Sequence, residues 1–364
     1  MIIRNKTKVN VLIVGPLDKP ITGVSICNDL ILEGLDKNQF NVKYINTSFD
    51  KFDENVGTLS IKKIFYFLKF YFLTYKVWNV DIIYITPGHT FLGIIKYASF
   101  ILAGWCLRKK VVLHIHSDTL VNTYLKSNKV KKSILTFVIS KADRGVVLSK
   151  SLVRNLSYFL PKDKIEVLFN FVEDKFILTE NEVKIKKYDK IKIVYLSNLM
   201  TQKGIFYLLE TFNLMLKNKI PFEAKLAGNI DDTIKEQIEK EIKLLNVEYL
   251  GVVKGDRKRE LLKWGNVFVF PSYLTEGLPI SILENMASGN VVFTTKHSSL
   301  DDIYKETSLV YIDKKSSDDI YNKVLNCFSD EEAIREMVIK NYNFIKSVGR
   351  EEVFLRKLMD IFNK

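Results

Sequence analysis

The sequence predicts an α/β protein with two doubly wound domains, each built on a parallel β-sheet, and a cleft between them. The chain has 364 residues, and domains usually contain roughly 100–200 residues, so two domains are expected. Short β-branched runs alternate with longer helical stretches, which is typical of a parallel sheet with helices on both faces. This alternation begins a second time near the middle of the chain.

Four short apolar runs bounded by turn residues predict buried parallel strands in the first half. They are Val9–Val14, Asp81–Ile85, Val111–Ile115 and Gly145–Leu148. Helices are expected between them, among others at Val24–Leu35 and Phe91–Leu107.

A second set of strands is expected after the polar stretch Glu180–Lys190, which we interpret as the linker. These strands are Ile191–Ser197, Phe222–Ala227, Val247–Gly251, Val267–Phe270 and Val291–Thr295. We therefore predict domains at residues 1–178 and 179–348. The amphipathic segment 349–364 is expected to form a C-terminal helix that packs back on the first domain.

The composition is that of a globular protein, with 47% hydrophobic and 27% charged residues. The three cysteines, Cys27, Cys106 and Cys327, form no CxxC pair, which argues against a disulfide framework and favours a reducing compartment. The apolar stretch Phe91–Leu107 is interrupted by Lys96 and is shorter than the roughly 20 residues of a membrane span. Without a recognisable signal peptide, we expect a cytoplasmic protein, either free or peripheral on the inner face of the cell membrane.

The positive charge is concentrated in the first half. Residues 1–175 contain 26 Lys and Arg against 14 Asp and Glu, whereas the remainder contains 29 against 28. Such asymmetry is typical of a domain that meets an anionic partner. Nucleic acid, an anionic membrane and a phosphorylated substrate are the candidates, and a solvated basic face without a partner is the alternative. No nucleic-acid-binding module is recognisable, so nucleic acid is not expected.

The segment Pro271–Gly289 contains the densest chemical signal. A predicted strand ends at Phe270, a turn-rich loop follows, and a helix is expected to start near Pro279. Backbone N–H groups at such a helix start, here at Gly277 and Leu278, can hold an anion such as a diphosphate. Glu276 in the loop and Glu284 in the helix can each accept hydrogen bonds from a pair of hydroxyl groups.

The pattern PSxxxEGLPxxxLExMAxG, with seven residues between Glu276 and Glu284, resembles the signature of glycosyltransferase family 4. Members are retaining enzymes with the GT-B fold, which has two Rossmann-like domains facing across a cleft. The resemblance implies that Glu276 contacts the transferred sugar and that Glu284 holds the nucleotide ribose. Ser272 belongs to the same donor-binding loop.

Further segments resemble the family in the same order along the chain. In YLSNLMTQKGIFYLLE, Lys203 matches the lysine that meets the donor diphosphate, and Gly204 starts the next helix. Asn198, after Ser197, stands where the family usually has an arginine, so one positive charge is missing. Gly228, Val252 and Val253 lie in loops that resemble those lining the nucleotide base.

In the first half, Thr22-Gly23-Val24 resembles the glycine loop that approaches the donor phosphate, although the family often has two glycines there. His116, at the end of a predicted strand, matches the histidine that touches the transferred sugar. His114 lies two residues earlier, so a metal-binding pair is conceivable, but zinc needs further ligands and no obvious set is present. Ser149 and Asn170 are expected to be structural. His89 and His297 are expected at the surface or in loops.

The chain contains no D-x-D triplet of the kind that holds a metal on the donor diphosphate in the other main fold of these enzymes. Lys203 and the helix starts are expected to neutralise the diphosphate instead, so no metal and no cofactor are predicted. The co-substrate is expected to be a nucleoside-diphosphate sugar, with UDP-sugar favoured over GDP-sugar.

The acceptor is expected to bind to the positively charged first domain. In IKKIFYFLKFYFLTYKVW (Ile61–Trp78), Lys62, Lys69 and Lys76 recur every seven residues and would form one helical stripe. A basic stripe with an aromatic face fits a helix on an anionic membrane. A core helix with a solvated lysine edge is the alternative. Lys109 and Lys131 add positive charge to the same domain.

The predicted function is transfer of a sugar to a hydroxyl of a lipid-linked or saccharide acceptor. His116, Glu276 and Lys203 are the expected catalytic residues. The Lys-, Ile- and Asn-rich composition favours bacterial surface-polysaccharide synthesis, such as capsule or O-antigen. The alternatives are a non-catalytic nucleotide-sugar-binding or scaffold protein and a sugar-nucleotide epimerase on the same fold.

Overall fold

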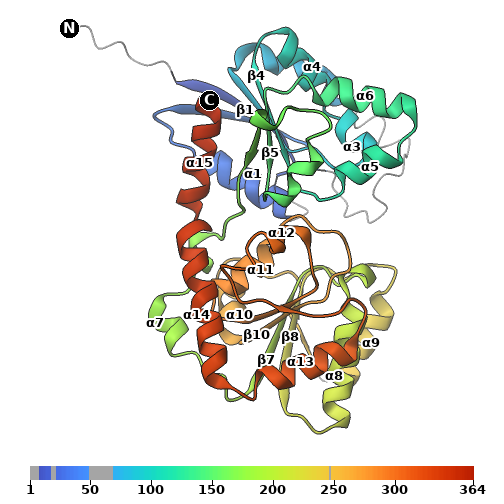
Figure 1. Cartoon of the computed structure of the whole chain (residues 1–364), viewed down its shortest axis with the longest axis vertical. Coiled ribbons are helices and arrows are strands. Elements are labelled where there is room, and N and C mark those ends of the chain that lie inside the picture. Colours follow the sequence, from blue (N-terminus) through green and yellow to red (C-terminus); the bar gives the residue numbers. More distant parts are fainter. Residues whose placement is uncertain (1–7, 18–21, 49–68, 246) are drawn as a thin grey trace, which may run out of the picture. The chain divides into compact units, whose positions relative to one another are not determined.

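The computed structural model describes residues 8–17, 22–48, 69–245 and 247–364. The chain divides into two compact units, one made of residues 1–169 with 354–364 and the other of residues 170–353 (Figure 1). The boundaries predicted from the sequence were 178/179 and 348/349. Each unit contains a six-stranded parallel sheet with helices, so the protein has the two-domain α/β architecture expected.

The sheet of the N-terminal unit has the strand order β2-β1-β3-β4-β5-β6, and all neighbours are parallel. The strands are β1 (Val9–Gly15), β2 (Phe40–Asn46), β3 (Ile82–Ile85), β4 (Lys110–Ile115), β5 (Arg144–Val147) and β6 (Ile165–Val167). The two edge strands, β2 and β6, were not predicted from the sequence. Edge strands are partly exposed, so they lack the continuous apolar runs by which the central strands were predicted.

The helices of this unit connect the strands in the order of a doubly wound fold. They are α1 (Gly23–Gly34), η1 (Thr74–Asn79), α3 (Phe91–Ile95), α4 (Ala98–Cys106), α5 (Leu120–Lys126), α6 (Lys129–Ile139), η2 (Ser151–Asn155) and η3 (Lys162–Lys164). The single helix predicted at Phe91–Leu107 is wrong, because the chain turns at Lys96 and Tyr97. Both side chains bind Thr47: Lys96 Nζ lies 2.7 Å from its carbonyl oxygen and the Tyr97 hydroxyl 2.7 Å from its Oγ1.

The predicted helix Ile61–Trp78 is only partly described, and Lys62 lies outside the described residues. Residues 69–73 are α-helical, but residues 74–79 form the 3₁₀ helix η1. The expectation of one α-helical lysine stripe is therefore wrong for Lys76. Thr74 is one local cause, since its Oγ1 bonds Ser99 Oγ at 2.8 Å and fixes the chain where the geometry changes.

The sheet of the C-terminal unit has the strand order β12-β11-β10-β7-β8-β9, again with parallel neighbours. The strands are β7 (Ile191–Leu196), β8 (Phe222–Ala227), β9 (Glu248–Tyr249), β10 (Val267–Phe270), β11 (Val291–Thr294) and β12 (Val310–Tyr311). The five strands predicted from the sequence are all present. The edge strand β12 was missed, and its two residues are too few for a recognisable pattern.

Helices lie on both faces of this sheet, with α8, α9 and α13 on one side and α10, α11 and α14 on the other (Figure 1). The helices are η4 (Asp174–Phe176), α7 (Glu180–Lys184), η5 (Thr201–Lys203), α8 (Ile205–Lys217), α9 (Lys235–Leu245), α10 (Gly255–Trp264), α11 (Ile280–Met286), α12 (Ser298–Asp301), α13 (Ser317–Cys327) and α14 (Glu331–Val348). The core between sheet and helices is apolar and includes Phe212, Val269 and Phe293.

The linker predicted at Glu180–Lys190 is wrong, because this stretch is packed within the C-terminal unit. It contains α7, which begins with a capping box between Thr179 and Glu182. Lys186 is buried, and its Nζ donates to the carbonyl oxygens of Leu262 and Ser288 and to Asn290 Oδ1. A stretch rich in lysine was mistaken for a solvated linker, although three acceptors hold one of its lysines in the interior.

The last helix, α15 (Glu351–Asn363), ends in the part of the chain that belongs to the N-terminal unit. Phe362 packs edge-on against Tyr84 and Phe40, and its carbonyl oxygen accepts from Lys110 Nζ at 2.8 Å. In the described portions of the chain, no helix combines the length and the apolar character needed to cross a bilayer.

Candidate functional site

The order of strands in the C-terminal sheet marks one position where a ligand is expected. From β7 the chain moves outward to β8 and β9, whereas from β10 it moves to β11 and β12 on the opposite side. The loops that leave β7 and β10 therefore diverge at the carboxyl ends of two neighbouring strands. In open α/β sheets, ligands bind at such a switch point. The loops concerned are residues 197–204 and 271–279, which contain most of the donor-site residues predicted from the sequence.

Two of those residues meet at this point. Lys203 Nζ lies 2.5 Å from Glu276 Oε1, and the two side chains are each 18% exposed. The same carboxylate oxygen accepts from Ser272 Oγ at 2.9 Å, and Lys203 Nζ lies 5.3 Å from the centre of the Phe270 ring. The lysine predicted at a diphosphate and the glutamate predicted at a sugar thus form one half-buried ion pair.

The two loops are also joined through their backbones. Tyr273 N donates to Gln202 O at 3.0 Å, while Thr295 Oγ1 binds the carbonyl oxygen of Ser272. Ser299 Oγ binds the carbonyl oxygen of Gly277, and Asn170 Nδ2 donates to that of Leu278 at 2.7 Å. Asn170 therefore has the structural role predicted for it. Because these carbonyl groups are held by the protein, the loop presents a defined conformation before any ligand binds.

Gly204 fits the switch point because of its backbone. It has φ of 78° and forms the N-cap of α8, which has no side-chain cap and no acidic residue in its first turn. A Cβ atom there would lie 2.2 Å from Pro271 O. Only glycine allows this approach of the two loops. The thirteen-residue helix α8 therefore points an uncompensated N-terminus into the site, which favours an anion.

Glu284 lies on α11 and is almost completely buried. Its Oε1 is 2.5 Å from Nζ of Lys258 on α10, and the exposed fractions of the two side chains are 1% and 12%. Burial raises the pKa of Glu284 above its usual value, and the adjacent ammonium group of Lys258 opposes that effect. Lys258 was not predicted as a site residue, because nothing in its spacing distinguishes it from the other cationic residues of α10.

The loops after β8 and β9 lie against the loop after β7. Gly228 N donates to Gly251 O at 2.9 Å, and a Cβ atom at Gly228 would lie 2.0 Å from Ser197 O. Val252 is exposed, whereas the side chain of Val253 is buried. Asn198 accepts through its carbonyl oxygen from the Tyr195 hydroxyl at 2.9 Å. The structure thus brings these predicted donor residues to the same edge of the sheet as Lys203.

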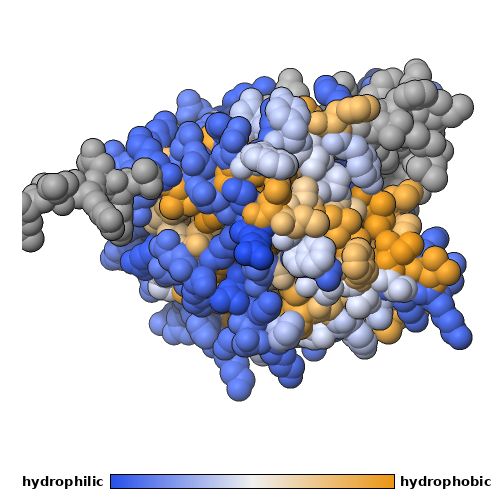
Figure 2. All heavy atoms as spheres, turned by 90° about the horizontal axis from the view of Figure 1, so that it is seen from above, coloured by the Kyte–Doolittle hydropathy of each residue, from blue (hydrophilic) through white to orange (hydrophobic). Residues whose placement is uncertain are grey.

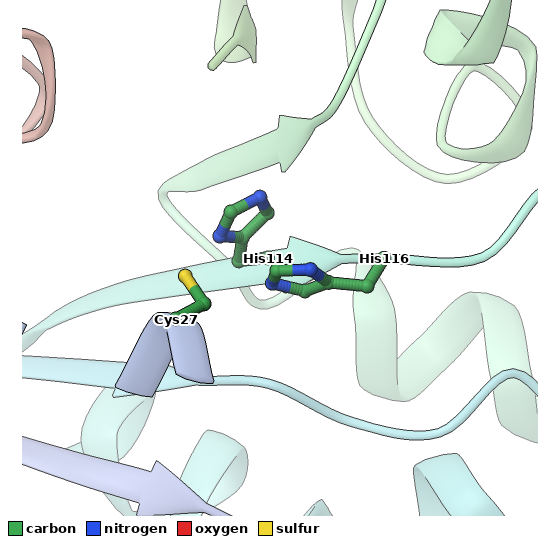
Figure 3. A group of neighbouring side chains, drawn as sticks. All are labelled: Cys27, His114 and His116. Atoms are coloured by element: carbon green, nitrogen blue, oxygen red, sulfur yellow. The ribbon is translucent and has the colours of Figure 1, made fainter. Parts of the chain in front are cut away.

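In the N-terminal unit, His116 directly follows β4, and Gly23 begins α1 with Thr22 as its N-cap. His114 is fully buried in β4, and its Nδ1 lies 2.5 Å from the Tyr84 hydroxyl. Burial lowers the pKa of His116 to about 3, so its imidazole is neutral near pH 7. Figure 3 shows both imidazole rings beside Cys27, a neighbour that the sequence analysis did not identify.

Two other predictions concern histidines outside this group. His89 is a half-buried residue in the loop after β3. His297 lies in a loop, as expected, and its side chain is buried. Its Nε2 lies 3.0 Å from Thr295 Oγ1, and its ring packs beside Phe270. No periodic pattern in the sequence indicates this burial, because it depends on how the loop after β11 folds over the switch point.

This chain resembles known proteins in sequence. Residues 178–344 match the model of the family described as Glycosyl transferases group 1. The chain is 21% identical over 351 residues to "Uncharacterized glycosyltransferase MJ1069" of Methanocaldococcus jannaschii, and the alignment covers 88% of this chain and 87% of that one. These similarities support a glycosyltransferase activity.

Solved structures show the same fold. The crystal structure of Anabaena Alr3699/HepE in complex with UDP has a TM-score of 0.74 and 12% identity, covering 98% of this chain and 100% of the other. Sucrose-phosphate synthase from Thermosynechococcus elongatus has a TM-score of 0.74 and 15% identity, covering 98% of each chain. HepE has also been solved with UDP-glucose. The protein thus has the GT-B fold, as predicted.

Proposed function

We propose that this protein is a metal-independent retaining glycosyltransferase that moves a hexosyl group from a nucleoside-diphosphate sugar to a hydroxyl acceptor. The main support for this proposal is the ion pair between Lys203 and Glu276 at the switch point. An ammonium group beside a helix N-terminus is complementary to a diphosphate, and a carboxylate beside it is complementary to sugar hydroxyls. This pair lies within the region that matches the family model.

Each group has a definite task in the proposed reaction. The bond from the anomeric carbon to the diphosphate breaks, the bond to the acceptor oxygen forms on the same face, and the leaving diphosphate takes the acceptor proton. Lys203 and the N-terminus of α8 stabilise the negative charge that builds up on the diphosphate. Glu276 and the neutral imidazole of His116 hold the sugar. Glu284 is proposed to bind the ribose. This requires Lys258 to give up part of its contact with the Glu284 carboxylate.

The proposed donor is a UDP-sugar. The solved complexes of HepE with UDP and UDP-glucose support this choice over a GDP-sugar. Val252 and Val253 are proposed to border the base and Gly23 to approach the phosphates. Ser197, Asn198, Gly228 and Ser272 are proposed to complete the donor site.

The acceptor is proposed to be reached at an anionic membrane, where a lipid-linked acceptor or a growing surface polysaccharide would be found. Several large apolar side chains of the N-terminal unit are exposed, including Phe72 at 80% and Trp78 at 69%. Lys141 Nζ lies 4.2 Å from the Trp105 ring centre and 5.0 Å from that of Phe137, both of which are also exposed.

These residues define what we call the aromatic–lysine face. They lie in residues 69–79, which include η1, in α4, and in or just after α6, and α4 packs against both η1 and α6. Figure 2 shows hydrophobic residues gathered beside hydrophilic ones on one face of the molecule. Lys69, Lys76, Lys109 and Lys131 add positive charge to the same elements or their ends. Aromatic side chains with lysines suit the headgroup region of an anionic bilayer, so a peripheral position on the inner face of the cell membrane is proposed.

A thermal-shift experiment with equal concentrations of UDP, GDP and ADP tests the donor site, because a ligand that binds the folded state raises Tm. We expect the largest shift with UDP and loss of that shift in Lys203→Ala. Lys217→Ala, at the opposite end of α8, is the matched control and should retain it. Anomeric analysis of the product from a UDP-sugar and a lipid extract then tests retention. Donor binding without turnover would favour a nucleotide-sugar-binding scaffold, and conversion of the sugar nucleotide itself would favour an epimerase.

A further inference from the structure

Three donor atoms suited to a transition metal converge in the N-terminal unit. Cys27 comes from α1, His114 from β4, and His116 from the residue after β4. One donor atom of each residue lies within 4.8 Å of those of the other two. Figure 3 shows the thiol of Cys27 and both imidazole rings gathered in one place. Cys27 is far from the two histidines in the sequence, and the packing of α1 against the sheet brings it to them.

The surroundings leave part of this cluster without hydrogen-bond partners. Cys27 and His114 are fully buried. Nε2 of His114 and Nε2 of His116 are both buried, and neither has a partner among the residues that the structure describes. Buried polar atoms are normally paired, so the unpaired ring nitrogen of each histidine is available to a further ligand.

A fourth residue orients His114. The Tyr84 hydroxyl bonds its Nδ1 at 2.5 Å and lies 3.9 Å from Cys27 Sγ. Metal-binding histidines commonly have one ring nitrogen held by such a neighbour, which fixes the ring and its tautomer. The two imidazole rings lie with their centres 4.0 Å apart.

We propose that Cys27, His114 and His116 form a binding site for Zn²⁺ or a similar borderline-soft cation. A thiolate with two imidazoles is a ligand set that suits zinc, and three protein ligands leave a fourth position for water or another small donor. Zn–S bonds of about 2.3 Å and Zn–N bonds of about 2.0–2.1 Å place tetrahedral ligands roughly 3.4–3.6 Å apart. The three donor atoms lie within 4.8 Å of one another, so they would need to move about 1 Å closer together to bind the metal.

The thiol must lose its proton when the metal–sulfur bond forms, and the proton passes to solvent. Burial raises the pKa of Cys27 to about 12, so the free site holds a neutral thiol. The bound cation offsets the charge of the thiolate, and the site then carries a net charge of one rather than two. The proposal does not depend on the enzymatic activity proposed above.

Titration of EDTA-treated, dialysed full-length protein with Co²⁺ tests the site, because a cobalt–thiolate bond produces a charge-transfer absorption. We expect saturation at one equivalent and displacement of Co²⁺ by Zn²⁺. Cys27→Ser should lose the thiolate absorption, whereas Cys106→Ser, which removes an exposed thiol, should keep it. His116→Asn changes a half-buried ligand and should weaken binding at least tenfold, which keeps the test decisive if Cys27→Ser does not fold. An unchanged absorption in Cys27→Ser, or no binding by the unaltered protein, would overturn the proposal.

Discussion

Lys203 and Glu276 share an ion pair of 2.5 Å, although they come from loops that follow two different strands. The residue expected to bind the diphosphate is therefore held by the residue expected to bind the sugar, and their charges compensate each other. A diphosphate entering the site must draw Lys203 away from Glu276, which leaves the carboxylate available for the sugar hydroxyls.

Glu276→Gln is therefore expected to change nucleotide binding and catalysis in opposite directions. Without the carboxylate, Lys203 is free to meet the phosphates, so UDP should bind about three- to tenfold more tightly. Transfer should fall at least about 100-fold, because the sugar loses a charged acceptor. Calorimetry with UDP and turnover assays measure the two effects. Glu210→Gln, an exposed change on α8, is the control. Weaker UDP binding or normal turnover in Glu276→Gln would contradict the assignment.

Gly204→Ala is expected to destabilise the C-terminal unit and to disturb the anion site. The positive φ of 78° costs about 1–2 kcal/mol for a residue with a side chain. The new Cβ would also meet Pro271 O at 2.2 Å, so the total loss should exceed about 3 kcal/mol. Gly251→Ala separates the two causes, because Gly251 has φ of 66° but no atom within 4 Å of the place that a Cβ would take. If urea unfolding shows the same loss of unfolding free energy in Gly204→Ala and Gly251→Ala, the contact with Pro271 is unimportant.

Lys258→Met is expected to cost about 3–5 kcal/mol of unfolding free energy at pH 7, because it leaves the Glu284 carboxylate buried without its cation. The pKa of Glu284 is already raised by burial, and loss of Lys258 should raise it further. In the unfolded chain Glu284 has its ordinary pKa of 4.5, whereas in the folded variant its pKa is higher. At a pH below that higher value Glu284 is protonated in the folded variant and no longer places an unpaired charge in the interior. The loss of unfolding free energy caused by the substitution therefore becomes smaller as the pH falls. Urea unfolding at pH 5 and pH 7 measures this dependence. A deficit that is the same at both values would mean that Glu284 is not the group responsible.

The aromatic–lysine face should bind vesicles that contain anionic lipid and should do so less well at high salt. Replacing Phe72 and Trp78 by serine removes two exposed apolar side chains, and we expect at least tenfold weaker binding in co-sedimentation. Tyr304→Ser, an exposed aromatic change in the C-terminal unit, should have no effect. Equal binding to neutral and anionic vesicles, or no binding by the unaltered protein, would refute a membrane role for this face.

The central strands and the loop containing Glu276 could be predicted because their signals are local. Buried parallel strands appear in a sequence as short apolar runs. A loop that follows such a run therefore lies at the carboxyl edge of the sheet, where ligands bind. The contact between Lys203 and Glu276 depends on β7 and β10 being neighbours, which no local pattern shows. The partner of Glu284 could not be predicted for the same reason. The lysine-rich stretch around Lys186 was predicted to be a solvated linker. Lys186 is in fact buried, because its ammonium group donates to carbonyl oxygens that are distant in the sequence.

The proximity of Cys27 to His116 leads to a last prediction, which joins the metal site to the proposed reaction. A ring nitrogen of His116 that binds Zn²⁺ cannot also contact the sugar, so stoichiometric Zn²⁺ should inhibit transfer and EDTA should restore it. Cys27 has no task in the proposed reaction, so Cys27→Ser should keep the basal rate and resist inhibition. Initial rates at increasing Zn²⁺ measure both effects. If Zn²⁺ inhibits the serine variant equally, the inhibitory ion binds elsewhere. If cobalt spectra show binding at Cys27 while transfer continues at its full rate, the metal site stands and His116 has no part in holding the sugar.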